Sequence, residues 1–271
     1  MLCGLPFGQQ RRFLMNNENI LLPVLAEAIK IPGVRINRSE FLQKYLGKYY
    51  SQDKISQAIE KGTFHAGIDV KVIDKIAGNI IAQETLKCTG SSFGLGIPGG
   101  FALIGTVPAD LAQYYAFSIR IIQKLAYIYG WPDFNLDDAS GESIYYIVLF
   151  LGVMSGVGLA NSTLKFVSNC LSKQALKKLP QMVLSKGIVY PLVKQIAKIL
   201  GKQMTKEVFA KGVSKTIPIV SGFIAGGLTF AMFQPSCKKL KKQLQSEFGK
   251  IYNDEELKDE LNLYNIYDEN T

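Results

Sequence analysis

The stretch from Ser143 to Leu164, SIYYIVLFLGVMSGVGLANSTL, contains no charged residue and is bounded on both sides by charged residues. Two further windows, Cys88 to Ala109 and Thr216 to Cys237, are also uncharged. Each window holds 22 residues, enough for a straight helix to cross a hydrocarbon core of about 30 Å. These windows decide the fold, because apolar sequence so concentrated must be buried in lipid or in protein.

Glycine content distinguishes the windows. The first contains six glycines and two prolines, too many helix breakers for one continuous helix. Gly152 and Gly156 in the second window are four residues apart, as are Gly222 and Gly226 in the third, and this spacing lets helix backbones approach closely. Such packing fits a helix pair in lipid and equally a tight core in a soluble protein, so both environments stay open.

Lysine residues surround the third window. Residues 165–215 hold eleven lysines and one acid, Glu207, which by the positive-inside rule places them in the cytoplasm. Four lysines within residues 238–242 follow the window, so both of its ends carry the same signal. A turn at Gly226-Gly227 keeps both ends on one side, with arms of roughly 16 Å. We therefore expect a hairpin or re-entrant geometry here rather than a straight crossing.

Outside the windows, apolar residues recur at helical spacing, as in residues 21–29 and 41–46, with a break at Pro32-Gly33. Ser39 and Ser51 are the expected N-caps of two of these short helices. No stretch alternates apolar and polar residues as a strand does. The expected fold is an all-α multi-helix bundle with glycine-rich apolar helical hairpins.

The chain divides by composition into three expected regions. Residues 1–85 form an amphipathic helical region, and residues 86–245 form a helical core that contains the three windows. Residues 246–271 form an acidic tail, because eight acids and two lysines follow from Glu247 onward.

The net charge of +9 indicates an anionic partner. Residues 183–211 resemble a basic amphipathic helix, with Lys194, Lys198, Lys202 and Lys206 at four-residue spacing on one side. Such a helix can lie on an anionic membrane surface, and a solvated outer face of a bundle shows the same pattern. The segment has no arginine and few aromatic residues, which argues against nucleic-acid binding.

Residues with catalytic or metal-binding chemistry are scarce. The four cysteines lack CxxC spacing and His65 is the only histidine, so the sequence predicts no metal site, no cofactor and no catalytic group. The glycine-rich run at residues 94–100 lacks the GK[ST] ending of a phosphate-binding loop. A hydrolase with His65 as its base stays as an alternative. The scattered thiols and the lack of a signal-peptide pattern predict a cytoplasmic location.

Several motifs resemble the EcsC protein family over roughly residues 85–245. They are Gly99-Gly100, Val107-Pro108-Ala109-Asp110, Arg120, Tyr129-Gly130, Lys215-Thr216-Ile217-Pro218 and Gly226-Gly227. The chain has Thr229 where the family has a polar asparagine in its second glycine-rich helix. The resemblance implies a bacterial, helical, membrane-associated protein, sometimes encoded beside an ABC exporter, with no established chemistry.

Two charged residues of the first motif region are candidate ion-pair positions. Asp110 follows Pro108 in the first turn of an expected helix, where the helix dipole favours a carboxylate. Arg120 lies ten residues on, about 15 Å along the same helix, so the two side chains cannot pair. Each needs a partner on another element, and the glycine-rich helices are the first place to look for one.

Together these patterns predict a non-enzymatic, helical, membrane-associated protein. Its glycine-rich hairpins would insert into the cytoplasmic leaflet, and its lysine helix would lie on anionic headgroups, with a membrane protein as a further partner. A soluble bundle that binds a lipid or another apolar ligand, located in the cytoplasm, is the first alternative, and a hydrolase is the second. The sequence does not predict an oligomeric state.

Overall fold

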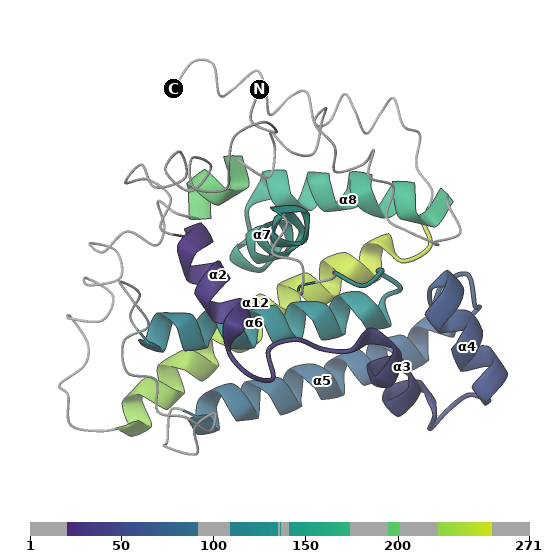
Figure 1. The fold of residues 1–271 in the computed structure, drawn as a ribbon, viewed down its shortest axis with the longest axis horizontal. Helices are drawn as coiled ribbons and strands as arrows, with labels where there is room; N and C mark the ends of the chain where they lie inside the picture. Colours follow the sequence, from purple (N-terminus) through teal and green to yellow (C-terminus); the bar gives the residue numbers. More distant parts are fainter. Residues whose placement is uncertain are drawn as a thin grey trace.

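The computed structural model describes residues 21–91, 109–134, 136, 141–173, 195–200 and 222–250. Every regular element within these residues is an α-helix and none is a strand, which confirms the predicted all-α bundle (Figure 1). A short helical segment occupies residues 195–200. The other helices are α2 (Leu21–Lys30), α3 (Arg38–Leu46), α4 (Gln52–Lys61), α5 (Val70–Ser91), α6 (Ala109–Ile128), α7 (Gly141–Ser155), α8 (Gly158–Lys173) and α12 (Gly222–Glu247).

The starts of α3 and α4 test the predicted caps. Asn37 caps α3, because its side-chain oxygen accepts a hydrogen bond of 3.0 Å from the backbone N–H of Glu40. The prediction that Ser39 caps this helix was therefore wrong, since asparagine two residues earlier supplies the acceptor first. Ser51 is the N-cap residue of α4, as predicted, although its side chain makes no capping hydrogen bond. The break at Pro32-Gly33 is confirmed by the positive φ of 78° at Gly33.

The second uncharged window forms a helical hairpin. Helix α7 ends at Gly156, which has a φ of 80°. The N–H of Val157 donates to the carbonyl of Gly152 at 2.9 Å, and the N–H of Gly156 donates to that of Val153 at 3.0 Å. This pair of bonds is a Schellman motif, which ends a helix where glycine adopts the left-handed conformation. The chain then turns directly into α8.

Gly152 lets α7 approach its neighbours closely. A Cβ atom at this position would lie 2.7 Å from Cβ of Ala160 on α8 and 2.6 Å from Cγ2 of Ile196. Both separations are too short for real atoms, so no larger side chain fits without movement. The prediction that this glycine allows close helix packing is confirmed, and the packing is within the protein.

The third window does not form the expected hairpin. Helix α12 runs without interruption through Gly226-Gly227 and spans 26 residues, about 39 Å. The turn predicted at Gly226-Gly227 was therefore wrong. Each glycine in a helix interior costs only about 1 kcal/mol, which the continuing helix can offset by cooperative hydrogen bonding. A consequence is that the apolar start of α12 and its lysines belong to one helix.

The first window is only partly described. Helix α5 extends through Cys88 to Ser91, and α6 begins at Ala109, directly after Pro108. The glycine-rich residues 92–108 lie outside the described residues, and so does the predicted loop at residues 94–100.

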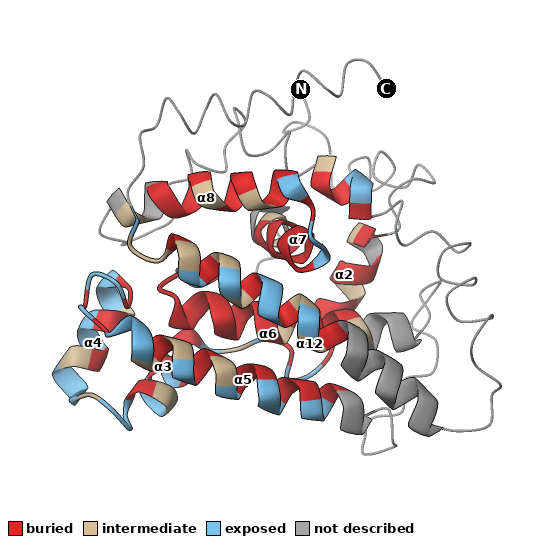
Figure 2. Cartoon of the chain, turned by 180° about the vertical axis from the view of Figure 1, so that it is seen from behind, coloured by how far each residue is buried: buried red, intermediate tan, exposed pale blue. Residues whose placement is uncertain are grey.

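Helix α7 is the centre of the core. Residues 146–151 are each at most 5% exposed, and α7 contacts α6, α8 and α12 (Figures 1 and 2). Phe150 packs against Trp131 with 4.8 Å between ring centroids, and burial of each such side chain contributes about 1.5–3 kcal/mol. The second window is therefore covered by protein. Among the described residues, none of the helices combines the length and the low charge needed to cross a membrane.

Helices α5 and α12 pack against each other and against α6. They run antiparallel, because Phe248 at the end of α12 contacts Phe64, which precedes α5, while Lys241 pairs with Asp74 further along α5. Helices α2, α3 and α4 cover the ends of this group (Figure 1).

The expected boundary between residues 85 and 86 falls inside α5. The side-chain amide of Gln123 on α6 also joins the two sides, since it donates to the carbonyl of Val34 at 2.8 Å and accepts from the N–H of Ile36 at 3.0 Å. Buried Arg38 donates to the carbonyls of Ile59 and Trp131. Within the described ranges, residues from both sides of residue 85 share one hydrophobic core.

Candidate functional site

The exposed parts of α5 and α12 carry several lysines. Asp74, Glu84 and Glu247, the acids of these two helices, are buried or partly buried, so every exposed charged residue on them is a lysine. We call five of these residues the basic face, since they lie on α12 and on the part of α5 beside it. They are Lys71, Lys75, Lys238, Lys239 and Lys242.

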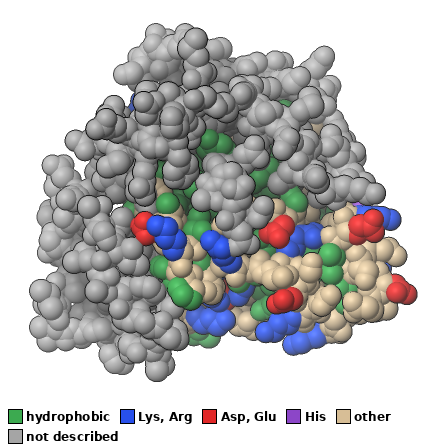
Figure 3. Space-filling view, in the orientation of Figure 1, with side chains coloured by type: hydrophobic (Ala, Val, Ile, Leu, Met, Phe, Trp, Pro, Cys, Tyr) green, Lys and Arg blue, Asp and Glu red, His purple; other side chains and the backbone are tan. Residues whose placement is uncertain are grey.

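The side chains of the basic face form no ion pairs within the described part of the chain, although the exposed Asp69 precedes α5 and accepts a hydrogen bond of 2.8 Å from the backbone N–H of Lys71. Lys241 forms an ion pair of 2.8 Å with Asp74, but among the described residues no ion pair involves a lysine of the basic face. Lys75 lies 5.7 Å from the ring centroid of Tyr49, a cation–π contact. Exposed segments of α5 and α12 lie side by side in Figure 2, whereas the opposite side, in Figure 3, has basic and acidic side chains interspersed.

The four lysines predicted to face lipid are mostly outside the described residues. Lys198 is exposed on the short helix at residues 195–200, whose buried side chains include Ile196 and Leu200. This arrangement agrees with an amphipathic helix. The remaining predicted positions, Lys194, Lys202 and Lys206, lie outside the described residues.

The structure tests the two predicted ion-pair positions to different extents. Asp110 is the second residue of α6, in its first turn, and its side chain lies outside the described part. Arg120 pairs with Glu84 on α5, at 3.2 Å between Nε and Oε2, and also donates to the carbonyl of Gly33. Its acidic partner therefore comes from α5 and precedes the glycine-rich windows, instead of lying on the glycine-rich helices as expected.

Glu84 is the centre of a four-residue ion cluster. It is 1% exposed, and its Oε1 lies 2.6 Å from Nζ of Lys124 and 3.2 Å from Nζ of Lys87. Both carboxylate oxygens are thus paired, one with Arg120 and the other with two lysines. The cluster joins α5 to α6 at a buried position, and we assign it a structural role.

Burial and charge act in opposite directions on the cluster. Burial favours the neutral form of Glu84, but Lys124 and then Arg120 outweigh it and lower its pKa from 4.5 to about 2. Burial likewise lowers the pKa of Lys124, and the Glu84 carboxylate opposes that decrease. Burial disfavours the charge on both groups, and their mutual attraction opposes that effect on both, as in other buried ion pairs.

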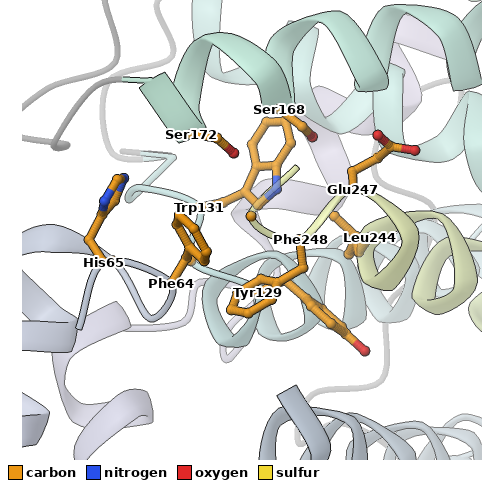
Figure 4. A pocket seen from close by; sticks show the side chains of 12 residues that line it. Phe64, His65, Tyr129, Trp131, Ser168, Ser172, Leu244, Glu247 and Phe248 are labelled. Atoms are coloured by element: carbon orange, nitrogen blue, oxygen red, sulfur yellow. The ribbon is translucent and has the colours of Figure 1, made fainter. Parts of the chain in front are cut away.

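A small pocket lies where four segments meet (Figure 4). Its walls come from the turn before α5, the end of α6, one side of α8 and the end of α12. The cavity volume is about 30 Å³, enough for one or two water-sized groups. The side chains that line it are Phe64, His65, Tyr129, Trp131, Ser168, Ser172, Leu244, Glu247 and Phe248.

Two glycines shape this pocket. Gly130 has a φ of 89°, and a Cβ there would lie 3.0 Å from Oγ1 of Thr63. Gly249 has a φ of 70°, and a Cβ there would lie 2.2 Å from the ring of Phe64. Because both backbones are left-handed and closely packed, the ends of α6 and α12 have fixed positions beside Phe64.

The pocket gathers the residue types of the hydrolase alternative. His65, Ser168, Ser172 and Glu247 all line it. In the described part of the chain, however, no hydrogen bond joins His65 to either serine or to Glu247. Figure 4 places His65 and Glu247 on opposite sides of Trp131. The geometry therefore does not provide the hydrogen-bonded series of nucleophile, base and acid that a catalytic triad requires.

The described thiols are not activated. Cys88 and Cys237 are buried, and burial raises the pKa of the Cys88 thiol to about 12 and also raises the pKa of the Cys237 thiol. Protonated, buried thiols are poor nucleophiles and poor metal ligands. Within the described ranges, no three His, Cys, Asp or Glu side chains are grouped so that they could hold a metal ion.

Sequence reasoning missed the ion cluster and the pocket. The cluster had a usable signal, because Arg120 and Lys124 are four residues apart on an otherwise apolar part of α6, and such a pair needs a buried acid. The pocket had no comparable signal. Ser168 and Glu247, each with one oxygen that has no partner among the described residues, are almost eighty residues apart. They come to one pocket only through the packing of α8 on α12.

Comparison with protein-family models, with curated proteins and with solved structures finds no match to this chain. The resemblance to the EcsC family therefore stays a prediction that rests on the quoted motifs. One of them, Tyr129-Gly130, has a structural explanation here. It ends α6 in a Schellman motif, where the N–H of Trp131 donates to the carbonyl of Ala126 at 3.0 Å.

Proposed function

We propose that this chain is a non-enzymatic helical protein that associates with the anionic cytoplasmic face of a membrane. The observation that carries the proposal is the basic face, whose five lysines are exposed and have no acidic partner among the described residues. The exposed Lys198 adds a further positive charge on another element.

The expected strength of this contact follows from the number of lysines. Each lysine near an anionic bilayer contributes about 1 kcal/mol, so contact through the whole basic face supplies up to about 5 kcal/mol. That amount supports reversible association and falls as salt screens the charges.

Nucleic acid is a weaker candidate for the same face. Helices α5 and α12 contain no arginine, the residue that best recognises phosphate in a bidentate manner. Among the described side chains of these two helices, none is an exposed aromatic ring on which a base could stack, although the exposed Tyr49 of a neighbouring segment contacts Lys75. A lipid surface needs neither feature, because it attracts lysine through its charge density alone.

The test is co-sedimentation of the full chain with vesicles. We expect binding to vesicles that contain phosphatidylglycerol, little binding to pure phosphatidylcholine vesicles, and loss of binding as salt rises to about 1 M. Replacement of Lys238, Lys239 and Lys242 by glutamine removes three charges and should weaken binding about 100-fold.

A matched control replaces Lys30, Lys44 and Lys61 by glutamine. These lysines are also exposed, but they belong to α2, α3 and α4 rather than to α5 or α12. The control has the same net charge as the test variant, so equal loss of binding by both would show that overall charge, and not the basic face, attracts the membrane.

An alkaline carbonate wash separates this surface contact from insertion. Protein held by lysines alone should leave the vesicles. Retention in the washed pellet would support the insertion of glycine-rich segments, as the sequence patterns predict for residues outside the described part.

A further inference from the structure

Two residues that line the pocket, Ser168 and Glu247, each have a buried oxygen without a hydrogen-bond partner in the described part of the chain. Glu247 and Ser168 are each 6% exposed, and within the described part of the chain neither Oε2 of Glu247 nor Oγ of Ser168 has a partner. The other carboxylate oxygen of Glu247 accepts bonds of 3.0 Å from Gln243 and from Ser246. Buried acceptors are normally paired, so this half-paired carboxylate retains capacity for a donor.

The remaining walls are aromatic. Phe64 packs edge-on against Phe248 at 5.6 Å between centroids, and Phe248 packs against Tyr129 at 6.0 Å. The Tyr129 hydroxyl lies 3.4 Å from Asp74, so its polar end already has a partner while its ring lines the pocket. Ring faces carry negative potential and attract cations.

The described lining residues include one acid and no lysine or arginine. Glu247 is that acid, and His65 also lies in the lining. A carboxylate, two serine hydroxyls and aromatic rings together favour a small cation that can donate hydrogen bonds. We propose that this pocket binds a primary ammonium group, with Glu247 as its counter-ion.

The size of the pocket restricts the ligand. A cavity volume of about 30 Å³ admits a –CH₂–NH₃⁺ group but little more, so the rest of the ligand must extend out of the opening. Ethanolamine has this shape, either as a free amine or as the headgroup of phosphatidylethanolamine. The two sources share the ammonium chemistry, and the experiment distinguishes them.

Trp131 supplies the readout. It is the only tryptophan of the chain and it lines the pocket, so its fluorescence should change when the pocket is occupied. We expect a saturable change when ethanolamine hydrochloride is added to the full chain, with a dissociation constant in the millimolar range. Sodium chloride at equal ionic strength should give no saturable change. Choline, which has no N–H donor and a bulkier head, should bind at least about tenfold more weakly.

Three variants test the assignment. Glu247→Gln keeps the shape of the side chain, removes the counter-ion and should weaken ethanolamine binding by about tenfold or more. Glu60→Gln is the matched control, because Glu60 is exposed and does not line the pocket. Phe64→Leu removes one ring at a position that is 39% exposed, so the fold should persist while binding weakens severalfold.

Vesicles identify the source of the amine. Uncharged phosphatidylcholine vesicles, with and without phosphatidylethanolamine, do not engage the basic face by charge. Retention by the phosphatidylethanolamine vesicles supports a lipid headgroup as the ligand, and saturable binding of free ethanolamine without such retention supports a soluble amine. A flat ethanolamine titration together with no retention would overturn the proposal, and so would equal binding of choline or of the Glu247→Gln variant.

The proposal for the pocket and the proposal for the basic face can be tested independently. The Lys238, Lys239 and Lys242 triple variant should bind ethanolamine like the unaltered chain. The Glu247→Gln variant should still bind anionic vesicles. Each result therefore bears on only one of the two proposals.

Discussion

Two buried glutamates on neighbouring helices have opposite surroundings. Glu84 on α5 is 1% exposed, and three cations pair with its two oxygens. Glu247 on α12 is 6% exposed, but its partners are neutral side chains that bind only one oxygen. Burial alone therefore does not decide what a carboxylate does. Glu84 has no unused oxygen for a ligand, whereas Glu247 has one.

The location of each residue explains the difference. Glu84 lies in the middle of a long helix that packs along α6, so Arg120 and Lys124 on consecutive turns of α6 can meet it. Glu247 is the last residue of α12, beside a turn and the side of α8. Two helices packed side by side bring charged side chains on successive turns together, as they do at Glu84. A helix end that meets several separate segments is packed less regularly, and at Glu247 a pocket is left between them.

The largest effect should come from Glu84→Gln. This change removes the negative charge and leaves Lys124 and Arg120 without a buried counter-ion, so we expect the free energy of unfolding to fall by about 3–5 kcal/mol. Urea denaturation followed by circular dichroism measures the change. Glu60→Gln, on the exposed side of α4, should leave the midpoint unchanged. A loss below about 1 kcal/mol for Glu84→Gln would remove the distinction between the two glutamates.

The fold could be predicted where local chemistry decides it. Helical periodicity, the turn at Pro32-Gly33 and the helix start at Ser51 depend on neighbouring residues, and the structure agrees with each. The continuity of α12 could not be predicted in this way. Gly226-Gly227 permits a turn but does not require one, and the choice depends on what the helix packs against.

The sites were harder to predict, because they join distant residues. Arg120 could be identified as needing a partner, but no local rule selected Glu84 on a different helix. Phe64, Trp131 and Glu247 form the pocket only after α5, α6 and α12 have packed. Contacts of this kind depend on tertiary geometry, which periodicity and spacing do not contain.

Lowering the pH should remove the stabilisation that the charged form of Glu84 contributes. Its pKa is lowered from 4.5 to about 2 in the folded protein, so its contribution is fully present above pH 4.5 and is lost as the pH falls through 2. The contribution lost is about 3 kcal/mol. We expect the stability difference between the unaltered chain and Glu84→Gln to stay constant above pH 4.5 and to shrink as the pH falls from 4.5 to 2.5, measured by urea denaturation at each pH. A constant difference across this range would contradict the assigned ion cluster.

Removal of one cation should have a smaller effect than removal of the shared acid. In Arg120→Met, Glu84 keeps Lys124 and Lys87, and the unbranched apolar side chain of methionine preserves part of the packing of the arginine stem. The lost interactions are the 3.2 Å pair with Glu84 and the bond to the Gly33 carbonyl, at a side chain that is 19% exposed. We expect a loss of about 2 kcal/mol in unfolding free energy. Lys30→Met, which removes an exposed pair with Glu27, should cost less than about 1 kcal/mol.

The smallest effect should come from Glu247→Gln in the absence of ligand. The amide keeps an oxygen that can accept from Gln243 or Ser246, and it adds an N–H₂ group beside the unpartnered Oγ of Ser168. Removing a buried, half-paired charge stabilises the fold, whereas losing the charge-assisted hydrogen bonds destabilises it. We therefore expect the free energy of unfolding to change by no more than about 1 kcal/mol in either direction. Urea denaturation with and without ethanolamine measures it. If Glu247 served only the fold, as Glu84 does, the substitution would destabilise the chain by several kcal/mol and ethanolamine would stabilise neither form.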